Sequence, residues 1–581
     1  MMSKYLEFPP NYDRRPEIEV EVSDLEVWSD WKSICATLAE SDCVIFDHYQ
    51  GVDSEFFKKA LTSGISFDHV FDVSSAMKSP EQIQEMVFPD VTDDRVFGYY
   101  TRLHLKDFFE PEKVQALRQE INAAKGKILV FGIGAALVCE GPGFLVYADM
   151  ARWEIQQRQR ANLVNNLGIE NKNESASSTY KHSYFVDWRI LDRHKKKLYK
   201  KWDFVIDANK ITPLMITGAT LNGAMEDLVK RPFRVVPFFD PGPWGGQWMR
   251  EVCNLDEDAD NYAWCFDCVP EENSLLLKFG EQVFETPAIN LVFQQPRQLL
   301  GQAVYGRFGD EFPIRFDFLD TMEGGNLSLQ VHPLTQYIQE HFGMHYTQDE
   351  SYYIMDAGDD ASVYLGIKNQ ADPEAMIADL RKAQEEGIDF DAEKYVNTWP
   401  AKKHDHFLIP AGTVHCSGKN SMVLEISATP YIFTFKLWDW GRLGLDGKPR
   451  PINIKHGARN IQWDRNTDWT RENLINRIQQ VNEGKGYTEE KTGLHETEFI
   501  ETRRHWFSDA VRHETHGSVN VLNLVEGEEA VVESPGNSFK PFVVHYAETF
   551  IIPEAVKEYT IRPYGRSKGK QCATIKAYIR H

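Results

Sequence analysis

The chain has 581 residues, more than one hydrophobic core normally organises, because single cores stop growing at roughly 250–300 residues, so several domains are expected. Its hydrophobic fraction of 42% and aromatic fraction of 12% are typical of packed globular domains and exclude an intrinsically disordered chain. A formal net charge of −23 argues against broad binding to nucleic acid or to an anionic membrane, so an anionic substrate would need a local basic pocket.

The start of the chain and its apolar windows lack the patterns of export and membrane segments. No window approaches the roughly 20 apolar residues that span a bilayer, and MMSKYLEFPPNYDRRPEIEV has no signal-peptide core. The 8 cysteines are scattered, which is typical of reduced thiols, and the CxxC pair Cys265 and Cys268 is expected to be two thiols of one strand. We therefore expect a cytoplasmic protein with no membrane partner and no nucleic acid partner. The sequence does not indicate its oligomeric state.

Residues 1–230 alternate short apolar runs with charged stretches of helical spacing. The apolar runs include CVIFDHY, KILVFGIGAAL and WDFVIDA, and the stretch PEKVQALRQEINAAKG has the spacing of a helix. Such alternation predicts an α/β domain with a largely parallel sheet.

A glycine turn in this region has part of the pattern of a phosphate-binding loop. In KILVFGIGAALV an apolar run enters Gly132 and Gly134, and glycines let backbone N–H groups approach an anion. The order strand, glycine turn, helix and then Asp149 resembles a degenerate P-loop kinase. A GxxxxGK[ST] motif is missing, so no lysine reaches a terminal phosphate, and we expect a catalytically silent domain rather than a working kinase.

After Arg231 the sequence changes to short β-branched and aromatic runs separated by Gly, Pro and Asp, which is typical of a sandwich or barrel. We expect a domain over 231–480 with a helical insertion near 373–399, because PEAMIADLRKAQEEGIDFDAEKYVNTW has helical spacing. Strand-like runs return in the last part, so residues 481–581 are expected to form a second β module. The predicted fold class is therefore multidomain α+β.

Three segments of the middle region carry metal-ligand types. In LSLQVHP, Gln330 and His332 are two residues apart, so on a strand both side chains leave the same face. Glu350 begins another strand-like run, and the Pro/Gly turn in LIPAGTVH delivers His415. Two imidazoles, a carboxylate and an amide oxygen form a mixed site that suits zinc and leaves room for substrate or water.

These segments resemble the signatures of type I mannose-6-phosphate isomerases. LSLQVHP, DESYYIMD and IPAGTVHCSG each resemble a family motif, and PFFDPGPWGGQWMRE is similar to its WGG opening. The resemblance covers residues 233–581 and implies two cupin-type β-barrel (jelly-roll) modules. It also implies one Zn²⁺ per chain, a small sugar phosphate as substrate, interconversion of mannose 6-phosphate and fructose 6-phosphate, and as metal ligands Gln330, His332, Glu350 and His415.

The remaining positions follow from the same resemblance. Lys436 falls where the family has an arginine that borders the sugar, which keeps the charge but loses the bidentate fork. Gln348 stands where many members have a lysine, and Ser328 matches a serine beside the substrate. We expect Ser328 and Lys436 to bind substrate, and Lys436, Arg442 and Glu425 to be the candidate catalytic residues.

Two questions stay open from the sequence. The proton-transfer group is one of several: the imidazoles of His404 and His406, a zinc-bound water, or Glu425. Asp439, Asp446 and Arg450 lie in a Gly/Pro-containing segment that is expected to be a rim loop. The competing interpretation is a metal cupin that binds a sugar phosphate without turning it over, and Gln348 and Lys436 are the departures that support it.

Overall fold

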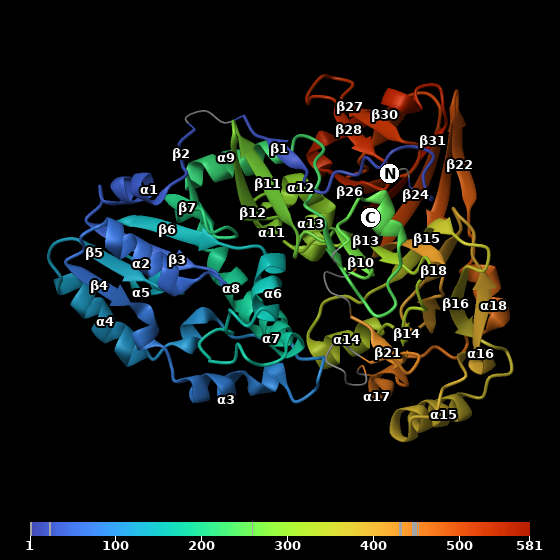
Figure 1. Ribbon diagram of the computed structural model, residues 1–581, viewed down its shortest axis with the longest axis horizontal. Helices are drawn as coiled ribbons and strands as arrows, with labels where there is room; N and C mark the ends of the chain where they lie inside the picture. Colours follow the sequence, from blue (N-terminus) through green and yellow to red (C-terminus); the bar gives the residue numbers. More distant parts are fainter. Residues whose placement is uncertain are drawn as a thin grey trace.

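The computed structural model describes residues 3–21, 25–257, 259–428, 433–443, 450 and 452–580. An α/β half from the first part of the chain lies beside a β-rich half that contains the rest (Figure 1). The multidomain mixture of helices and sheets expected from the sequence is therefore present. Within the described residues no helix is long and apolar enough to cross a membrane.

The α/β half is built on a seven-stranded sheet, most of which is parallel. Strands β4, β5, β3, β6 and β7 run parallel, and β8 and β2 add an antiparallel edge. Every residue of β3 is buried, as expected for a central strand covered on both faces. In spatial order the strands are β2 (Val27–Trp28), β8 (Leu214–Thr217), β7 (Phe204–Asp207), β6 (Phe144–Asp149), β3 (Cys43–His48), β5 (Ile128–Phe131) and β4 (His69–Asp72).

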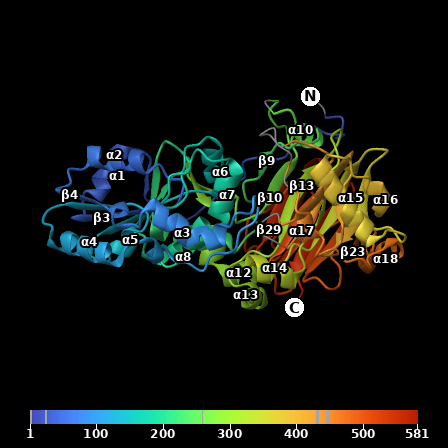
Figure 2. The same ribbon diagram turned by 90° about the horizontal axis from the view of Figure 1, so that it is seen from below.

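Helices cover both faces of this sheet. Figure 2 shows α1 and α2 on one face and α4 and α5 on the other. Helices α6, α7 and α8 lie at the side that meets the β-rich half. The helices are α1 (Trp31–Leu38), α2 (Ser54–Gly64), α3 (Pro80–Val91), α4 (Pro111–Ala123), α5 (Ala135–Val138), α6 (Arg152–Arg160), α7 (Ala176–His182), α8 (Trp188–Lys195) and α9 (Gly218–Leu228).

Two sheets form the first part of the β-rich half, and their strands carry the candidate site. Hydrogen bonding between described residues does not close them into one barrel, so the cupin assignment stays a prediction. One sheet has the order β18 (His406–Ile409), β15 (Glu350–Ala357), β20 (Ser421–Ser427), β13 (Arg315–Asp320), β10 (Trp264–Cys268) and β9 (Phe238–Asp240). The other has the order β17 (Val396–Pro400), β16 (Ser362–Ile367), β19 (His415–Ser417), β14 (Leu329–Val331) and β21 (Phe435–Trp438).

A second pair of sheets follows at the carboxyl end. The predicted start of this module at residue 481 falls inside its first strand, β22. One sheet has the order β22 (Gln479–Gly484), β23 (Tyr487–Gly493), β24 (Ile500–Phe507), β31 (Cys572–Ile579), β26 (Asn520–Glu526) and β29 (Thr549–Ile552). The other has the order β25 (Val511–Glu514), β30 (Glu558–Pro563), β27 (Glu529–Glu533) and β28 (Phe542–His545).

The predicted helical insertion is confirmed over most of its length and wrong at its end. Helix α15 (Pro373–Glu386) begins with Asp372 as N-cap and ends at Gly387, whose φ of 68° suits glycine, and α16 (Ala392–Tyr395) follows. Residues 396–399 are strand, because they pair with β16 as part of β17. Shorter helices elsewhere are α10 (Trp248–Val252), α11 (Ile289–Gln294), α12 (Pro296–Leu300), α13 (Gln302–Phe308), α14 (Thr335–Phe342), α17 (Ile454–Gly457) and α18 (Thr467–Asn473).

Both expectations for the cysteines agree with the structure. All 8 are free and buried, and Cys265 and Cys268 lie on the single strand β10.

The amino-terminal segment is joined to the β-rich half. Strand β1 (Glu17–Glu19) pairs in parallel with β11 (Ser274–Phe279), which also pairs with β12 (Gln282–Pro287). Nearby, the buried Arg234 guanidinium lies 2.7 Å from a Glu548 carboxylate oxygen and 3.7 Å from Asp267. The Tyr12 hydroxyl donates to Asp267 at 2.6 Å. Charged groups from three distant parts of the chain therefore meet in one buried network, in which the two carboxyl groups share the Arg234 cation.

Removing the cation from this network should destabilise the whole protein. Arg234→Met leaves Glu548 and Asp267 buried without their counter-charge, and loss of one partner of a buried pair costs about 3–5 kcal/mol. Urea unfolding should show the free energy of unfolding reduced by that amount. The matched control Arg512→Met, which breaks an exposed ion pair with Glu558, should change it little. Equal stability of both variants would contradict this role.

Candidate metal centre and its pocket

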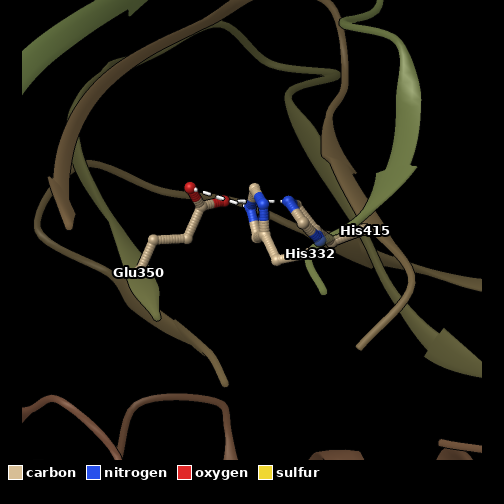
Figure 3. A group of neighbouring side chains, drawn as sticks. All are labelled: His332, Glu350 and His415. Carbon is tan, nitrogen blue, oxygen red and sulfur yellow. Dashed lines mark ion pairs between the residues drawn. The ribbon is translucent and has the colours of Figure 1, made fainter. Parts of the chain in front are cut away.

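Three buried side chains converge at one point in the first β module (Figure 3). His332 Nε2 lies 3.1 Å from one oxygen of Glu350, and His415 Nε2 lies 2.8 Å from the other. One ligand atom from each residue lies within 4.8 Å of the others, and all three side chains are almost inaccessible to solvent. These are three of the four residues that the sequence predicted as metal ligands, and they form a cluster that can hold a metal ion.

The orientation of the two imidazoles suits a metal ion. His332 Nδ1 lies 3.0 Å from the Phe433 carbonyl oxygen and His415 Nδ1 lies 2.9 Å from the Thr413 carbonyl oxygen. A ring that donates its Nδ1 proton to a carbonyl presents a lone pair at Nε2, which is how metal-bound histidines are usually oriented. His332 Nε2 and Glu350 Oε1 have no hydrogen-bond partner among the described residues. Two nitrogen lone pairs and a carboxylate that face one another repel unless a cation lies between them. His332, His415 and Glu350 therefore fit a zinc ion.

The turn before His415 explains why this side chain lies in the cluster with His332 and Glu350. The turn before it contains Gly412 at φ 90°, where a Cβ would meet the Gln462 side chain at 2.7 Å. The Gly412 N–H donates to the His332 carbonyl at 3.0 Å, and Ala411 N–H donates to Asp349 at 2.8 Å. These bonds fix the Pro/Gly turn against the strand of the first histidine.

The fourth predicted ligand lies beside the cluster. Gln330 and His415 are paired residues of β14 and β19, and the Gln330 side-chain nitrogen lies 3.2 Å from His415 Nε2. Rotating the Gln330 side-chain amide by half a turn would direct its oxygen toward the point where His332, Glu350 and His415 converge. The structure thus brings the four predicted ligands together, while their role as ligands stays a prediction.

A chain of polar side chains extends from Glu350. Gln348 Nε2 donates to Glu350 at 2.8 Å and to Glu425 at 3.1 Å. Beyond Glu425, Arg315 lies 3.6 Å from that carboxylate and 2.9 Å from Asp317. The position where the family has a lysine is therefore a neutral amide that bridges two carboxyl groups. Arg315 and Asp317 lie in FPIRFDFLD, just upstream of LSLQVHP, and the sequence predicted no site role for either residue.

The two bridged carboxyl groups have opposite pKa shifts. Burial opposes the charge of Glu350, but His332 and His415, when protonated in the absence of a metal ion, lower its pKa well below the ordinary value. Burial, with the negative charges of Asp317 and Glu350, raises the pKa of Glu425 well above its ordinary value. Two neighbouring carboxyl groups therefore have pKa values shifted in opposite directions, which is an arrangement found in acid–base catalysis.

A cavity of about 460 Å³ opens beside these groups. From the β-rich half it is lined by Gln330, Gln348, Glu425, Lys436 and Ser328 among others, and also by Arg450, which the sequence placed only in a rim loop. Burial, together with the nearby charge of Arg450, lowers the pKa of Lys436 to about 7. This volume is within the range of small-molecule sites.

Asp439 contacts two arginines and the Ser328 hydroxyl at the edge of the cavity. It accepts a hydrogen bond from Ser328 Oγ at 2.9 Å, and its other oxygen lies 2.9 Å from Arg450. Arg442 donates to the Asn326 carbonyl at 2.6 Å and pairs with Asp439. Arg442 does not line the cavity, so the structure places it as a residue that positions Asp439. Asp446 lies outside the described residues.

Two of the candidate proton carriers are not at the cavity. His404 lies 2.9 Å from the Tyr353 hydroxyl and 3.2 Å from Glu526, and His406 lies 2.8 Å from the Ser351 hydroxyl. Neither lines the cavity. These two imidazoles, among the open alternatives for the proton-transfer group, therefore lie away from the cavity, and the register of β15 and β18 pairs Ile409, not His406, with Glu350.

The glycine turn of the α/β half is filled by the protein itself. The Gly134 and Ala136 N–H groups donate to the two oxygens of Asp47 at 2.9 and 3.0 Å. His194 contacts Asp47 at 2.8 Å, and Lys195 contacts Asp149 at 3.0 Å. Asp149 ends β6 and Asp47 is the next-to-last residue of β3. The strand order reverses between these two strands, which is where such sheets usually bind ligands. An internal carboxylate therefore occupies the anion cradle, and the resemblance to a P-loop kinase stays a prediction.

Comparison with known proteins divides the chain in two. A family model described as a domain of unknown function (DUF8485) matches residues 30–230. The mannose-6-phosphate isomerase ManA of Bacillus subtilis is 24% identical over 236 residues, which are 40% of this chain and 69% of the relative. The mannose-6-phosphate isomerase of Streptococcus mutans is 27% identical over 215 residues, 36% of this chain and 62% of the relative. The solved mannose 6-phosphate isomerase of Bacillus subtilis covers 60% of this chain and 99% of its own length, with a TM-score of 0.48 and 20% identity. About 40% of the chain is thus homologous, at low identity, to mannose-6-phosphate isomerases.

We expect the purified protein to contain about one zinc per chain, because four ligand-type side chains meet at one point. The double variant His332→Ala/His415→Ala should lose the metal, as measured by inductively coupled plasma mass spectrometry after dialysis. The control His404→Ala removes an imidazole remote from the cluster and should retain it. Full zinc occupancy in the double variant would refute the ligand assignment.

We also expect the full-length protein to show no ATP hydrolysis. Asp47 fills the backbone cradle, and the glycine turn supplies no lysine or hydroxyl for a terminal phosphate and its magnesium. A phosphate-release assay with ATP and Mg²⁺ tests this expectation. Hydrolysis that disappears in Asp149→Ala would overturn it.

Proposed function

We propose that the protein is a zinc-dependent aldose–ketose isomerase that interconverts mannose 6-phosphate and fructose 6-phosphate. Its two β modules, residues 231–480 and 481–581, would be cupins, the first of which holds the metal. The observation that carries the proposal is the buried triad of His332, Glu350 and His415 beside a cavity with a proton-retaining carboxyl group. Homology to mannose-6-phosphate isomerases over about 40% of the chain supports the substrate class.

The reaction moves a proton between two neighbouring carbons and creates negative charge on the substrate oxygens. Zinc held by His332, Glu350, His415 and Gln330 would act as a Lewis acid that stabilises this charge by several kcal/mol. The two imidazoles keep their Nδ1 protons on backbone carbonyls, which leaves Nε2 available for the ion. The protein's own side chains must then supply proton transfer and phosphate binding.

Glu425 is the group that we assign to proton transfer. It lines the cavity, and its raised pKa places it closer to the pH at which a carboxyl group both accepts and returns a proton efficiently. Gln348 holds Glu425 and Glu350 by hydrogen bonds from one amide nitrogen, so the two carboxyl groups keep a fixed separation. Glu425 would therefore act beside the metal without becoming a ligand.

Lys436 and Arg450 supply positive charge in the same cavity. No hydrogen bond or ion pair joins the Lys436 ammonium to another described side chain, and a lysine whose pKa is about 7 donates a hydrogen bond or a proton readily. Arg450 lines the cavity and lies 2.9 Å from Asp439. These two cations would bind the phosphate or the developing oxyanion, and Arg442 would act through Asp439.

A second candidate function is binding without turnover. It is favoured by Gln348, because a neutral amide stands where many family members have a lysine, and the carboxyl groups of Glu350 and Glu425 then lack that cation. A metal cupin of this kind would retain a sugar phosphate and leave its carbonyl in place.

An isomerisation assay separates the two functions. Zinc-loaded protein should convert mannose 6-phosphate to fructose 6-phosphate, a chelator should abolish the conversion, and Glu425→Gln should lower kcat by about 10²–10⁴-fold with zinc content unchanged. The exposed control Glu514→Gln should leave kcat as it is. Binding of mannose 6-phosphate by fully loaded protein without conversion would exclude the isomerase and leave the binding function.

A further inference from the structure

A second cavity, of about 590 Å³, opens where the two halves of the protein meet. One side is formed by helix α8, which lies at the edge of the α/β half that faces the β-rich half (Figures 1 and 2). The other side comes from the β-rich half and includes the segment that joins α14 to β15. No described residue lines both this junction cavity and the cavity beside the metal triad, so the two cavities are separate.

The junction cavity lies near the carboxyl ends of β3 and β6, where the strand order reverses and such sheets usually bind ligands. Tyr49 follows β3, and Arg152 begins α6 after β6. Both contact Asp192 of α8: the Tyr49 hydroxyl donates to one oxygen at 2.8 Å, and the Arg152 guanidinium pairs with the other. Arg152 and Asp192 line the cavity, so this pair connects it to the strand ends.

Helix α8 presents charged residues to the cavity on one face. At intervals of three, one and three residues, four charged side chains leave the same side of the helix and the turn after it: Arg189, Asp192, Arg193 and Lys196. All four line the cavity. Asp192 is paired with the arginine of α6, and Lys196 lies 2.8 Å from Asp310. Arg189 and Arg193 are left without a matched carboxylate.

Three arginines of the lining have no ion-pair partner in the described part of the chain: Arg102, Arg189 and Arg193. Arg189 is partly exposed and donates through Nε to the Tyr184 carbonyl oxygen at 3.1 Å, while its two terminal nitrogens have no hydrogen-bond partner among the described residues. Arg193 donates to two backbone carbonyl oxygens at 2.8 and 2.7 Å, which satisfies its N–H groups without neutralising its charge. Arg102 is exposed to solvent. The cavity can therefore offer guanidinium groups to an anion.

The lining carries more positive than negative charge, although the whole chain has a formal net charge of −23. Five arginines and lysines line the cavity, against four aspartates and glutamates. Burial raises the pKa of one of these acids, Glu271, to about 7, so at neutral pH it carries only part of its charge. Burial and the charge of Arg189 lower the pKa of Arg193. A bound anion would reduce this repulsion between cations.

Contacts between the two halves form the cavity before any ligand binds. The Tyr100 N–H donates to the carbonyl oxygen of Phe342, the last residue of α14, at 2.9 Å. The next residue, Gly343, has φ 70° and lies so close to the Tyr99 ring that an added Cβ would be 2.8 Å from it. A site whose walls are already in place loses less free energy on ordering when it binds a ligand.

We propose that the junction cavity is a second anion site, which binds the phosphate group of a small ligand through Arg189, with Arg102 and Arg193 adding positive charge. Guanidinium groups suit this role because their planar N–H donors match two phosphate oxygens. A volume of about 590 Å³ is within the range of small-molecule sites and admits either free phosphate or a small phosphate ester. The α/β half then binds a ligand near its strand ends although Asp47 fills its glycine turn. This site does not depend on the isomerase function proposed above.

Calorimetric titration of the full-length protein with inorganic phosphate and with glycerol 3-phosphate tests the site. We expect Arg189→Gln to weaken binding by about 10–150-fold, which is the loss of one charge-assisted hydrogen bond. Arg102→Gln, at an exposed position, should weaken it by about 2–5-fold. Lys436→Met, in the metal cavity, should keep the binding at the junction cavity. The control Arg512→Gln, which removes an exposed arginine paired with Glu558 at 2.6 Å, should match the parent.

The two probes also distinguish the source of the phosphate group. When Arg189→Gln weakens binding, a preference for glycerol 3-phosphate identifies an ester as the ligand, and a preference for inorganic phosphate identifies the free anion. The site is overturned if the parent binds neither probe, or if Lys436→Met loses the binding while Arg189→Gln keeps it. If thermal unfolding shows that Arg189→Gln is not folded, Arg102→Gln decides, because an exposed side chain can be changed without unfolding the protein. Unchanged binding by Arg102→Gln then overturns the site.

Discussion

The site depends on the burial of one carboxylate. Glu350 is withdrawn from water, which is costly for a charged group unless positive charge reaches it. The two histidines face it through Nε2, because their Nδ1 atoms lie against the carbonyls of Phe433 and Thr413. A cation between these three groups would relieve the cost, and burial beside Asp317 and Glu350 raises the pKa of the neighbouring Glu425. Both features follow from the withdrawal of carboxyl groups from water.

The α/β half lines part of the cavity, and a carboxylate of the protein itself occupies its own anion cradle. Its sheet ends in an anion cradle, but Asp47 accepts the backbone hydrogen bonds that a phosphate would otherwise receive. Helix α6, which follows β6 directly, reaches across to the cavity of the neighbouring half. Sheets of this kind often bind ligands at the carboxyl ends of their strands. Here the α/β half also lines one wall of a cavity that is formed largely by residues of the β-rich half.

Much of the fold and part of the site could be predicted from the sequence. The parallel strands followed from apolar runs such as Cys43–His48, and the four ligand-type residues followed from strand periodicity and a family resemblance. Contacts between segments that are distant along the chain had no comparable signal in the sequence. Nothing near Trp153 or Arg160 indicates a cavity, because their partners Phe238 and Asp240 lie about 80 residues away in the chain. The surroundings of His404 had no local signal either, because its contacts Tyr353 and Glu526 lie far away in the chain.

The central claim is that a zinc ion sits between these two imidazoles and the buried carboxylate. X-ray absorption spectroscopy at the zinc edge of the purified full-length protein tests it most directly. The account predicts a first shell of nitrogen and oxygen only, at about 2.0–2.2 Å, with the multiple-scattering signature of two imidazoles. A sulfur shell at about 2.3 Å would place the metal on cysteines and contradict the account, as would a first shell without imidazole.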